Sequence, residues 1–137
     1  VWVYTADRIL TPAEQEVIAT QLKPFLMSWA AHGDELFGDS LIHKNRFVIL
    51  AVDESSVTAS GCSIDTSVKF MKDLGAKLDV NFFDRLNLVI ERDDNFRRVH
   101  ISELKDYMEW NVFNPMVSSL NELREEWCSP VSASPFV

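Results

Sequence analysis

The stretch Phe47-Val48-Ile49-Leu50-Ala51-Val52 is the feature that most restricts the folds open to this chain. It is apolar at every position and rich in β-branched side chains, as strands that are buried on both faces are. Residues 36–43 precede it across Lys44-Asn45, a two-residue connection that suits a β-hairpin. We therefore predict a central strand over residues 46–52, covered at least in part on both faces and paired with the strand before it.

Helices are predicted on either side of this hairpin. Thr11, Pro12 and Glu14 supply a capping hydroxyl, a proline at the first helical position and an acid that closes a capping box, so a helix begins there. Pro24 lies within that helix and predicts either a kink or a division into two short helices. A second long helix is expected after Gly61, because the apolar side chains that follow recur at helical spacing.

Shorter elements are expected around and after these helices. The turn residues Asp93-Asp94-Asn95 connect two alternating segments and predict a second hairpin. Pro115 indicates that the last strand lies at an edge or a bulge. Ser102 and Ser119 are suited to cap short helices. The strands expected here cover residues 2–4, 86–91, 96–101 and 112–117.

Hairpins interspersed with helices favour the α+β class over a doubly wound parallel sheet. We predict a mixed or mainly antiparallel sheet of about five to six strands with three to four helices packed on it. The length of 137 residues fits a single domain, which we expect over residues 1–128. Residues 129–137 contain two prolines and three serines and are expected to form an extended C-terminal tail.

The charge of the chain excludes some classes of partner. The net charge is −8, which repels phosphate backbones, so we expect no nucleic-acid partner. No apolar run approaches the roughly 18 residues of a membrane-spanning helix, and no secretory signal is visible, so we expect no membrane insertion and a cytoplasmic location. Cys62 and Cys128 are then expected to remain thiols. The oligomeric state is left open between monomer and homodimer.

Several segments together resemble a family of small bacterial proteins, many of which carry the label "ABC transporter ATPase". The resemblance covers most of the chain and is most specific at residues 61–65. The segments that carry it are Trp29-Ala30-Ala31-His32-Gly33, Arg46-Phe47-Val48-Ile49-Leu50-Ala51-Val52-Asp53-Glu54, Ala59-Ser60-Gly61-Cys62-Ser63-Ile64-Asp65, Val112-Phe113-Asn114 and Glu122-Leu123.

The family label implies ATP hydrolysis, which the residues allow us to examine. The segment from Gly33 to Ser40 has the glycine and serine spacing of a phosphate-binding P-loop, but Asp39 stands where the lysine belongs. An aspartate repels the phosphates that the lysine attracts. An ATP-hydrolysing transporter subunit is therefore the last of our three functional hypotheses.

Cys62 is the main candidate for chemistry, because it lies at the expected start of the second long helix. The helix dipole and the exposed N–H groups there lower the pKa of a thiol and also attract an anionic ligand. His32 would act as a base, and Asp53 or Asp65 would orient it, if the fold brought these residues to Cys62. The alternative is structural: a cysteine that packs in the core, with Ser63 and Asp65 capping the helix.

Our first hypothesis is a non-catalytic domain that binds a partner protein or a small ligand, including an anionic one, near residues 61–65. The second is a thiol-dependent enzyme or redox protein that uses Cys62. We predict no cofactor and no metal site, because the acids and histidines lack the spacing of metal ligands. The side chains and backbone groups expected to bind the ligand belong to Ser60, Gly61, Ser63, Asp53, Trp29 and Arg46.

Overall fold

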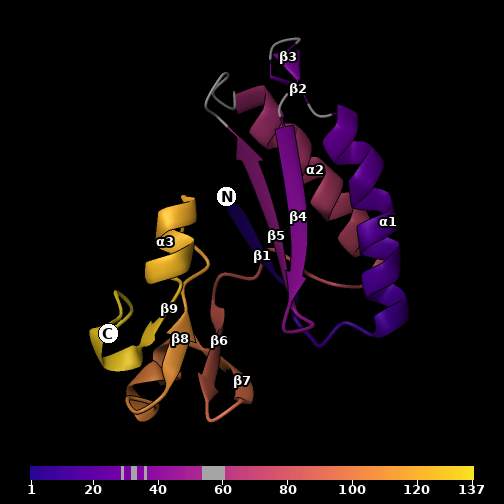
Figure 1. The fold of residues 1–137 in the computed structure, drawn as a ribbon. Helices are drawn as coiled ribbons and strands as arrows, with labels where there is room; N and C mark the ends of the chain where they lie inside the picture. Colours follow the sequence, from indigo (N-terminus) through magenta and orange to yellow (C-terminus); the bar gives the residue numbers. More distant parts are fainter. Residues whose placement is uncertain (29, 32–33, 36, 54–60) are drawn as a thin grey trace. The chain divides into compact units, whose positions relative to one another are not determined.

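The computed structural model describes the backbone of residues 1–28, 30–31, 34–35, 37–53 and 61–137. It describes the side chains of these residues except for residues 28–37 and 52–64. It confirms the α+β class, with antiparallel sheets and helices in the described chain (Figure 1). Contacts divide the chain into two compact units, an N-terminal unit of Tyr4–Phe83 and a C-terminal unit of Val1–Val3 with Asp84–Val137. The single domain expected over residues 1–128 therefore stays a prediction, and each unit is described by itself.

The N-terminal unit is built on a three-stranded sheet whose order is β1-β5-β4. The central strand is the apolar segment singled out above, and its residues Phe47, Val48, Ile49 and Leu50 are buried, as predicted. The two long helices lie side by side along the sheet, where the rings of Phe25 and Phe70 stack with centroids 4.3 Å apart (Figure 1). The elements are β1 (Trp2–Thr5), α1 (Pro12–Ser28), β2 (Ala30–Ala31), β3 (Asp34–Glu35), β4 (Phe37–His43), β5 (Phe47–Asp53) and α2 (Gly61–Leu78).

The hairpin between β4 and β5 is confirmed. The strands are antiparallel, and His43 pairs with Phe47 across the turn. Lys44 and Asn45 have φ angles of 52° and 59°, and the N–H of Arg46 donates to the carbonyl of His43 at 3.2 Å. Positive φ at both central residues is the geometry of a type I′ turn, whose twist matches that of the strands it joins.

Helix α1 begins as the capping box predicts. The N–H of Thr11 donates to a carboxylate oxygen of Glu14 at 2.9 Å, and the N–H of Glu14 donates to the hydroxyl of Thr11 at 3.2 Å. The helix continues without interruption through Pro24, so the expected division into two short helices is wrong. The buried side chains of Ile18, Leu22 and Leu26 hold both sides of the proline against the core, which offsets the lost hydrogen bond.

Helix α2 ends in a Schellman motif. Asp79 follows the last helical residue with a φ of 56°, and the N–H of Val80 then donates to the carbonyl of Gly75 at 2.8 Å. This bond brings the returning chain so close that a Cβ on Gly75 would lie 2.4 Å from the Val80 oxygen and 3.2 Å from the ring of Phe82. Glycine at position 75 is therefore required for the chain to turn back along the helix.

The C-terminal unit is a four-stranded antiparallel sheet with the order β7-β6-β8-β9. The predicted hairpin at Asp93-Asp94 is present, and these residues have φ angles of 51° and 64°. The buried core of the unit consists of Leu88, Ile90, Val99, Leu104, Val112 and Val131. The elements are β6 (Asn87–Arg92), β7 (Asn95–His100), a 3₁₀ helix η1 (Ile101–Asp106), β8 (Asn111–Phe113), α3 (Leu120–Glu125), β9 (Cys128–Pro130) and a second 3₁₀ helix η2 (Val131–Ala133).

Three local expectations differ from the structure in this unit. The strand expected over residues 112–117 ends at Phe113, before Pro115, and it pairs with both β6 and β9, so the expected edge position is wrong. The segment near Ser102 is a 3₁₀ helix capped by the imidazole of His100, which accepts from the N–H of Ser102 at 3.1 Å. The segment expected as an extended tail forms β9 and η2, because Val131 is fully buried in the core.

The strands also group differently from the single sheet of five to six strands that we expected. They form a three-stranded and a four-stranded sheet, besides the two-residue pair of β2 with β3. Sheet membership depends on which strand edges meet, and that information is not contained in the alternation of polar and apolar residues along a strand.

Candidate functional site: a pocket at the C-terminal end of helix α2

The residues predicted to form a site lie partly outside the described chain. Trp29, His32 and Ser60 are among those whose structure is not described. Gly61, Cys62 and Ser63 form the first turn of α2, as predicted. The same helix carries Asp65, which is exposed to solvent.

Two segments that belong to the predicted site do come together. Strand β2, which connects Trp29 to His32 in the sequence, contacts α2. Figure 1 shows β2 and β3 at the end of the N-terminal unit where α2 begins and where β5 ends at Asp53. The contact is between β2 and α2; His32 lies outside the described residues, so its approach to Cys62 stays a prediction.

Arg46 is placed away from the other predicted ligand-binding residues. It lies just before β5, whereas Asp53 is the last residue of that strand. Seven residues of extended chain at about 3.3 Å each separate them by about 23 Å. Arg46 is half-buried, and this burial lowers the pKa of its guanidinium. One small ligand therefore does not contact both residues.

The P-loop reading of residues 33–40 is also incompatible with the local structure. Gly38, Asp39 and Ser40 lie in β4, where they pair with Val52, Ala51 and Leu50. A phosphate-binding loop requires a strand, a loop and a helix in that order. Among the residues that the structure describes, no three His, Cys, Asp or Glu side chains are grouped to hold a metal ion.

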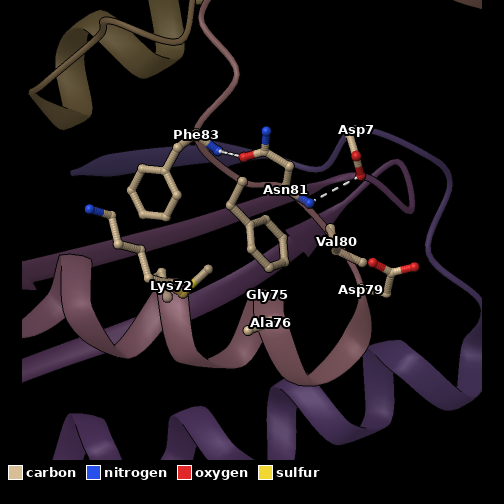
Figure 2. A pocket seen from close by; sticks show the side chains of 10 residues that line it. Asp7, Lys72, Gly75, Ala76, Asp79, Val80, Asn81 and Phe83 are labelled. Carbon is tan, nitrogen blue, oxygen red and sulfur yellow. Dashed lines mark hydrogen bonds between the residues drawn. The ribbon is translucent and has the colours of Figure 1, made fainter.

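A pocket of about 410 Å³ lies where the chain turns back along the C-terminal half of α2 (Figure 2). All of its lining belongs to the N-terminal unit. The buried side chains of Met71, Val80 and Phe82 supply an apolar wall. Its volume falls in the range of about 300–1,000 Å³ that is typical of small-molecule sites. The lining residues are Asp7, Met71, Lys72, Gly75, Ala76, Asp79, Val80, Asn81, Phe82 and Phe83.

Hydrogen bonds fix the rim of the pocket. A carboxylate oxygen of Asp7 accepts from the N–H of Asn81 at 3.2 Å, and this contact ties the segment after β1 to the segment after α2. The side-chain oxygen of Asn81 accepts in turn from the N–H of Phe83 at 2.9 Å, as Figure 2 shows. The Schellman motif at Gly75 holds the same segment from the other side. The pocket is therefore formed without a ligand.

The charged groups of the pocket are separated. Figure 2 shows Lys72 and Phe83 toward one end and Asp7 and Asp79 toward the other. The ammonium of Lys72 lies 5.6 Å from the centre of the Phe83 ring, in cation–π contact. The pocket thus has a cationic end and an acidic end, with apolar side chains between them.

The guanidinium of Arg8 lies near the acidic end, and its hydrogen bonds go to Glu14 and to the backbone. It makes a bidentate ion pair with Glu14, with N···O distances of 2.7 and 2.5 Å, and donates to the carbonyl of Leu78 at 2.9 Å. This pair and a hydrogen bond from the backbone of Thr11 lower the pKa of Glu14 to about 2. The Glu14 hydrogen bond raises the pKa of Arg8, and the charges of Asp7 and Asp79 raise it further.

The pocket was not predicted from the sequence. Its residues come from three segments: the segment after β1, the second half of α2 and the connection that follows α2. The one signal available was the spacing of Lys72, Ala76 and Asp79, which places them on one side of a helix and its end. That pattern is common on solvated helices and does not by itself indicate a site.

A comparison of the chain with protein families, with curated proteins and with solved structures found no match. In the part of the chain that the structure describes, no helix has the length and apolar character needed to cross a membrane.

Proposed function

We propose that this chain is a non-catalytic binding domain, and that the pocket at the C-terminal end of α2 receives a small ligand or the end of a partner protein. The observation that carries the proposal is the combination of an apolar wall with a few polar groups whose positions are fixed. Binding sites for small molecules have this composition, because apolar side chains supply affinity and a few polar groups supply orientation. The pocket side chains of Lys72, Asp79 and Asn81 are exposed and accessible.

The rigidity of the pocket supports binding rather than packing alone. Gly75 and the Schellman motif determine the path of the chain, and the Asp7–Asn81 hydrogen bond anchors it to the segment after β1. A site that is formed in advance loses less conformational entropy when it binds a ligand, so its affinity is higher.

This pocket and the predicted site at residues 61–65 are different places. Gly61 and Gly75 are fourteen residues apart on α2, which at about 1.5 Å per residue is about 21 Å along the helix. The anion-binding role of the helix start and the thiol chemistry of Cys62 stay predictions, to be tested separately from the pocket.

The proposal is tested by nuclear magnetic resonance with defined probe pools. Separate pools of amino acids, short peptides, nucleotides and sugar phosphates are titrated into the ¹⁵N-labelled full chain. We expect one pool to shift the amide signals of Gly75, Ala76 and Asp79–Phe83. The variant Ala76→Phe fills the pocket from an exposed helical position and abolishes these shifts, whereas Lys69→Phe, exposed on α2 outside the lining, retains them.

Two other results would contradict the proposed binding site. Shifts that persist in Ala76→Phe would place binding elsewhere on the chain. If no pool shifts the pocket amides at millimolar concentration, the pocket is not a binding site for these classes of molecule and the proposal is wrong.

A further inference from the structure

We infer that the ligand of this pocket is a short peptide of two or three residues with a free ammonium at one end and a free carboxylate at the other. The inference rests on the proposed function and specifies the ligand class of the same site. Its basis is the arrangement of opposite charges at the two ends of the pocket, with apolar side chains between them.

The acidic end is suited to an ammonium group. Asp7 uses one carboxylate oxygen to accept from the N–H of Asn81, which orients its side chain along the rim. Asp79 is exposed, and the part of the chain that the structure describes shows no ion pair on its carboxylate. Figure 2 shows both carboxylates toward the same end of the pocket, and the charges of both raise the pKa of Arg8. An ammonium between them would make charge-assisted hydrogen bonds, which are stronger than neutral ones.

The other end is suited to a carboxylate. The ammonium of Lys72 lies over the ring of Phe83, and within the described chain it forms no ion pair. The side-chain oxygen of Asn81 accepts from the N–H of Phe83 and so fixes the segment that carries this ring. The ammonium of Lys72 therefore offers donors to an anionic oxygen, as a peptide carboxylate requires.

The separation of the two ends sets the length of the ligand. Lys72 and the last helical residue, Leu78, are six positions apart, which at about 1.5 Å per residue is about 9 Å along α2, and Asp79 follows directly. A single amino acid has its two charges on one carbon and is too short to reach both ends. An extended peptide advances about 3.3–3.6 Å per residue, so two or three residues span the distance.

The wall between the ends is suited to an apolar side chain. Met71, Val80 and Phe82, with exposed fractions of 0%, 6% and 3%, form the covered floor of the pocket. The exposed Ala76 and the half-buried Phe83 present apolar surface to a ligand. Burial of a leucine-sized side chain there contributes affinity without directional requirements. The expected ligand therefore carries a central apolar residue between its charged termini.

The test compares the tripeptide alanyl-leucyl-alanine with its N-acetylated form and its C-amidated form, by isothermal titration and by the pocket amide shifts. Acetylation replaces the ammonium by a neutral amide that carries an added acetyl group, and amidation replaces the carboxylate by a neutral amide, so each modified peptide lacks one of the two charges. We expect the free tripeptide to bind and each modified form to bind about tenfold or more weakly, the loss that follows from one charge-assisted hydrogen bond.

Two variants assign each terminus to its end of the pocket. Asp79→Asn weakens binding of the free tripeptide but does not further weaken the N-acetylated form, and asparagine tolerates the positive φ at this position. Lys72→Gln weakens binding of the free tripeptide but does not further weaken binding of the C-amidated form. The matched controls Asp73→Asn and Lys69→Gln, exposed on α2 outside the lining, leave all three affinities unchanged.

The outcomes separate this inference from the proposed function. Equal affinity for the three peptides, or pocket shifts with nucleotides or sugar phosphates in place of peptides, overturns the peptide inference and leaves the pocket a binding site. Absence of pocket shifts with every probe overturns both.

Discussion

The backbone N–H of Val80 donates to the carbonyl of Gly75 at 2.8 Å, and this single bond determines how the chain leaves helix α2. It brings the Val80 oxygen to the space that a side chain at position 75 would occupy. The shape of the pocket therefore depends on a glycine that is buried in the last turns of a helix.

Gly75→Ala is expected to destabilise the protein, although alanine is the better helix former. The new Cβ would lie 2.4 Å from the Val80 oxygen, so the backbone has to shift. We expect the free energy of unfolding to fall by about 1–3 kcal/mol, as in other overpacked sites. Urea denaturation measures this change. Lys77→Ala, at an exposed position of the same helix, serves as the control and is expected to be nearly neutral. An increase in stability for Gly75→Ala would contradict the close approach.

Thr11→Ala removes the hydroxyl that accepts from the N–H of Glu14 at the start of α1. Loss of an N-cap side chain costs about 0.5–2 kcal/mol. We expect a decrease of this size in the free energy of unfolding, measured by urea denaturation at neutral pH. Thr20→Ala is the matched control, because Thr20 is exposed in the interior of the same helix and alanine is favourable there. Equal effects of the two substitutions would show that the capping box does not stabilise the helix.

The carboxyl of Glu14 makes stability depend on pH. Its pKa is lowered from 4.5 to about 2, first by the hydrogen bond from Arg8 and then by that from the backbone of Thr11. Because the folded pKa is depressed, the ionised group stabilises the folded state above its unfolded pKa. This contribution is lost as the pH falls from 4.5 toward 2.

The measurement compares the native chain with Glu14→Gln across that range of pH. The native chain is expected to be more stable at pH 6, and the difference is expected to decrease steadily below pH 4.5. Glu16→Gln, which leaves the hydrogen bonds of Arg8 and Thr11 in place, is the control. A difference that does not change with pH would rule out the ionised pair as its source.

Asp94→Gly is expected to stabilise the hairpin between β6 and β7. Asp94 has a φ of 64°, where a residue with a Cβ is strained, aspartate less than most, and where glycine is not. The change creates an Asp-Gly pair, a preferred sequence for a type I′ turn. The hydrogen bond to Glu91 is made by the backbone N–H of residue 94 and is retained.

For this variant we expect a gain of up to about 1 kcal/mol in the free energy of unfolding, measured by thermal or urea denaturation, because relief of the left-handed strain exceeds the entropy cost of glycine. Asp94→Val tests the same geometry in the other direction, since a β-branched side chain at positive φ is strained. Destabilisation by the glycine together with tolerance of the valine would contradict the turn geometry.

Local features of the fold were determined by the sequence alone. The capping box of Thr11 and Glu14, the turn at Lys44-Asn45 and the turn at Asp93-Asp94 each depend on groups within a few residues of one another. The central position of β5 also followed from its sequence, because a strand that is apolar on both faces is stable only inside a sheet. These features together predicted the α+β class.

Tertiary structure decided the rest. The division of the strands into separate sheets and the burial of Val131 depend on contacts between segments far apart in the chain. The pocket brings Asp7 to Asn81, which are 74 positions apart, and no periodic pattern marks either residue. Periodicity and capping report interactions along one element, whereas a binding pocket depends on which elements meet, and only the folded chain determines that.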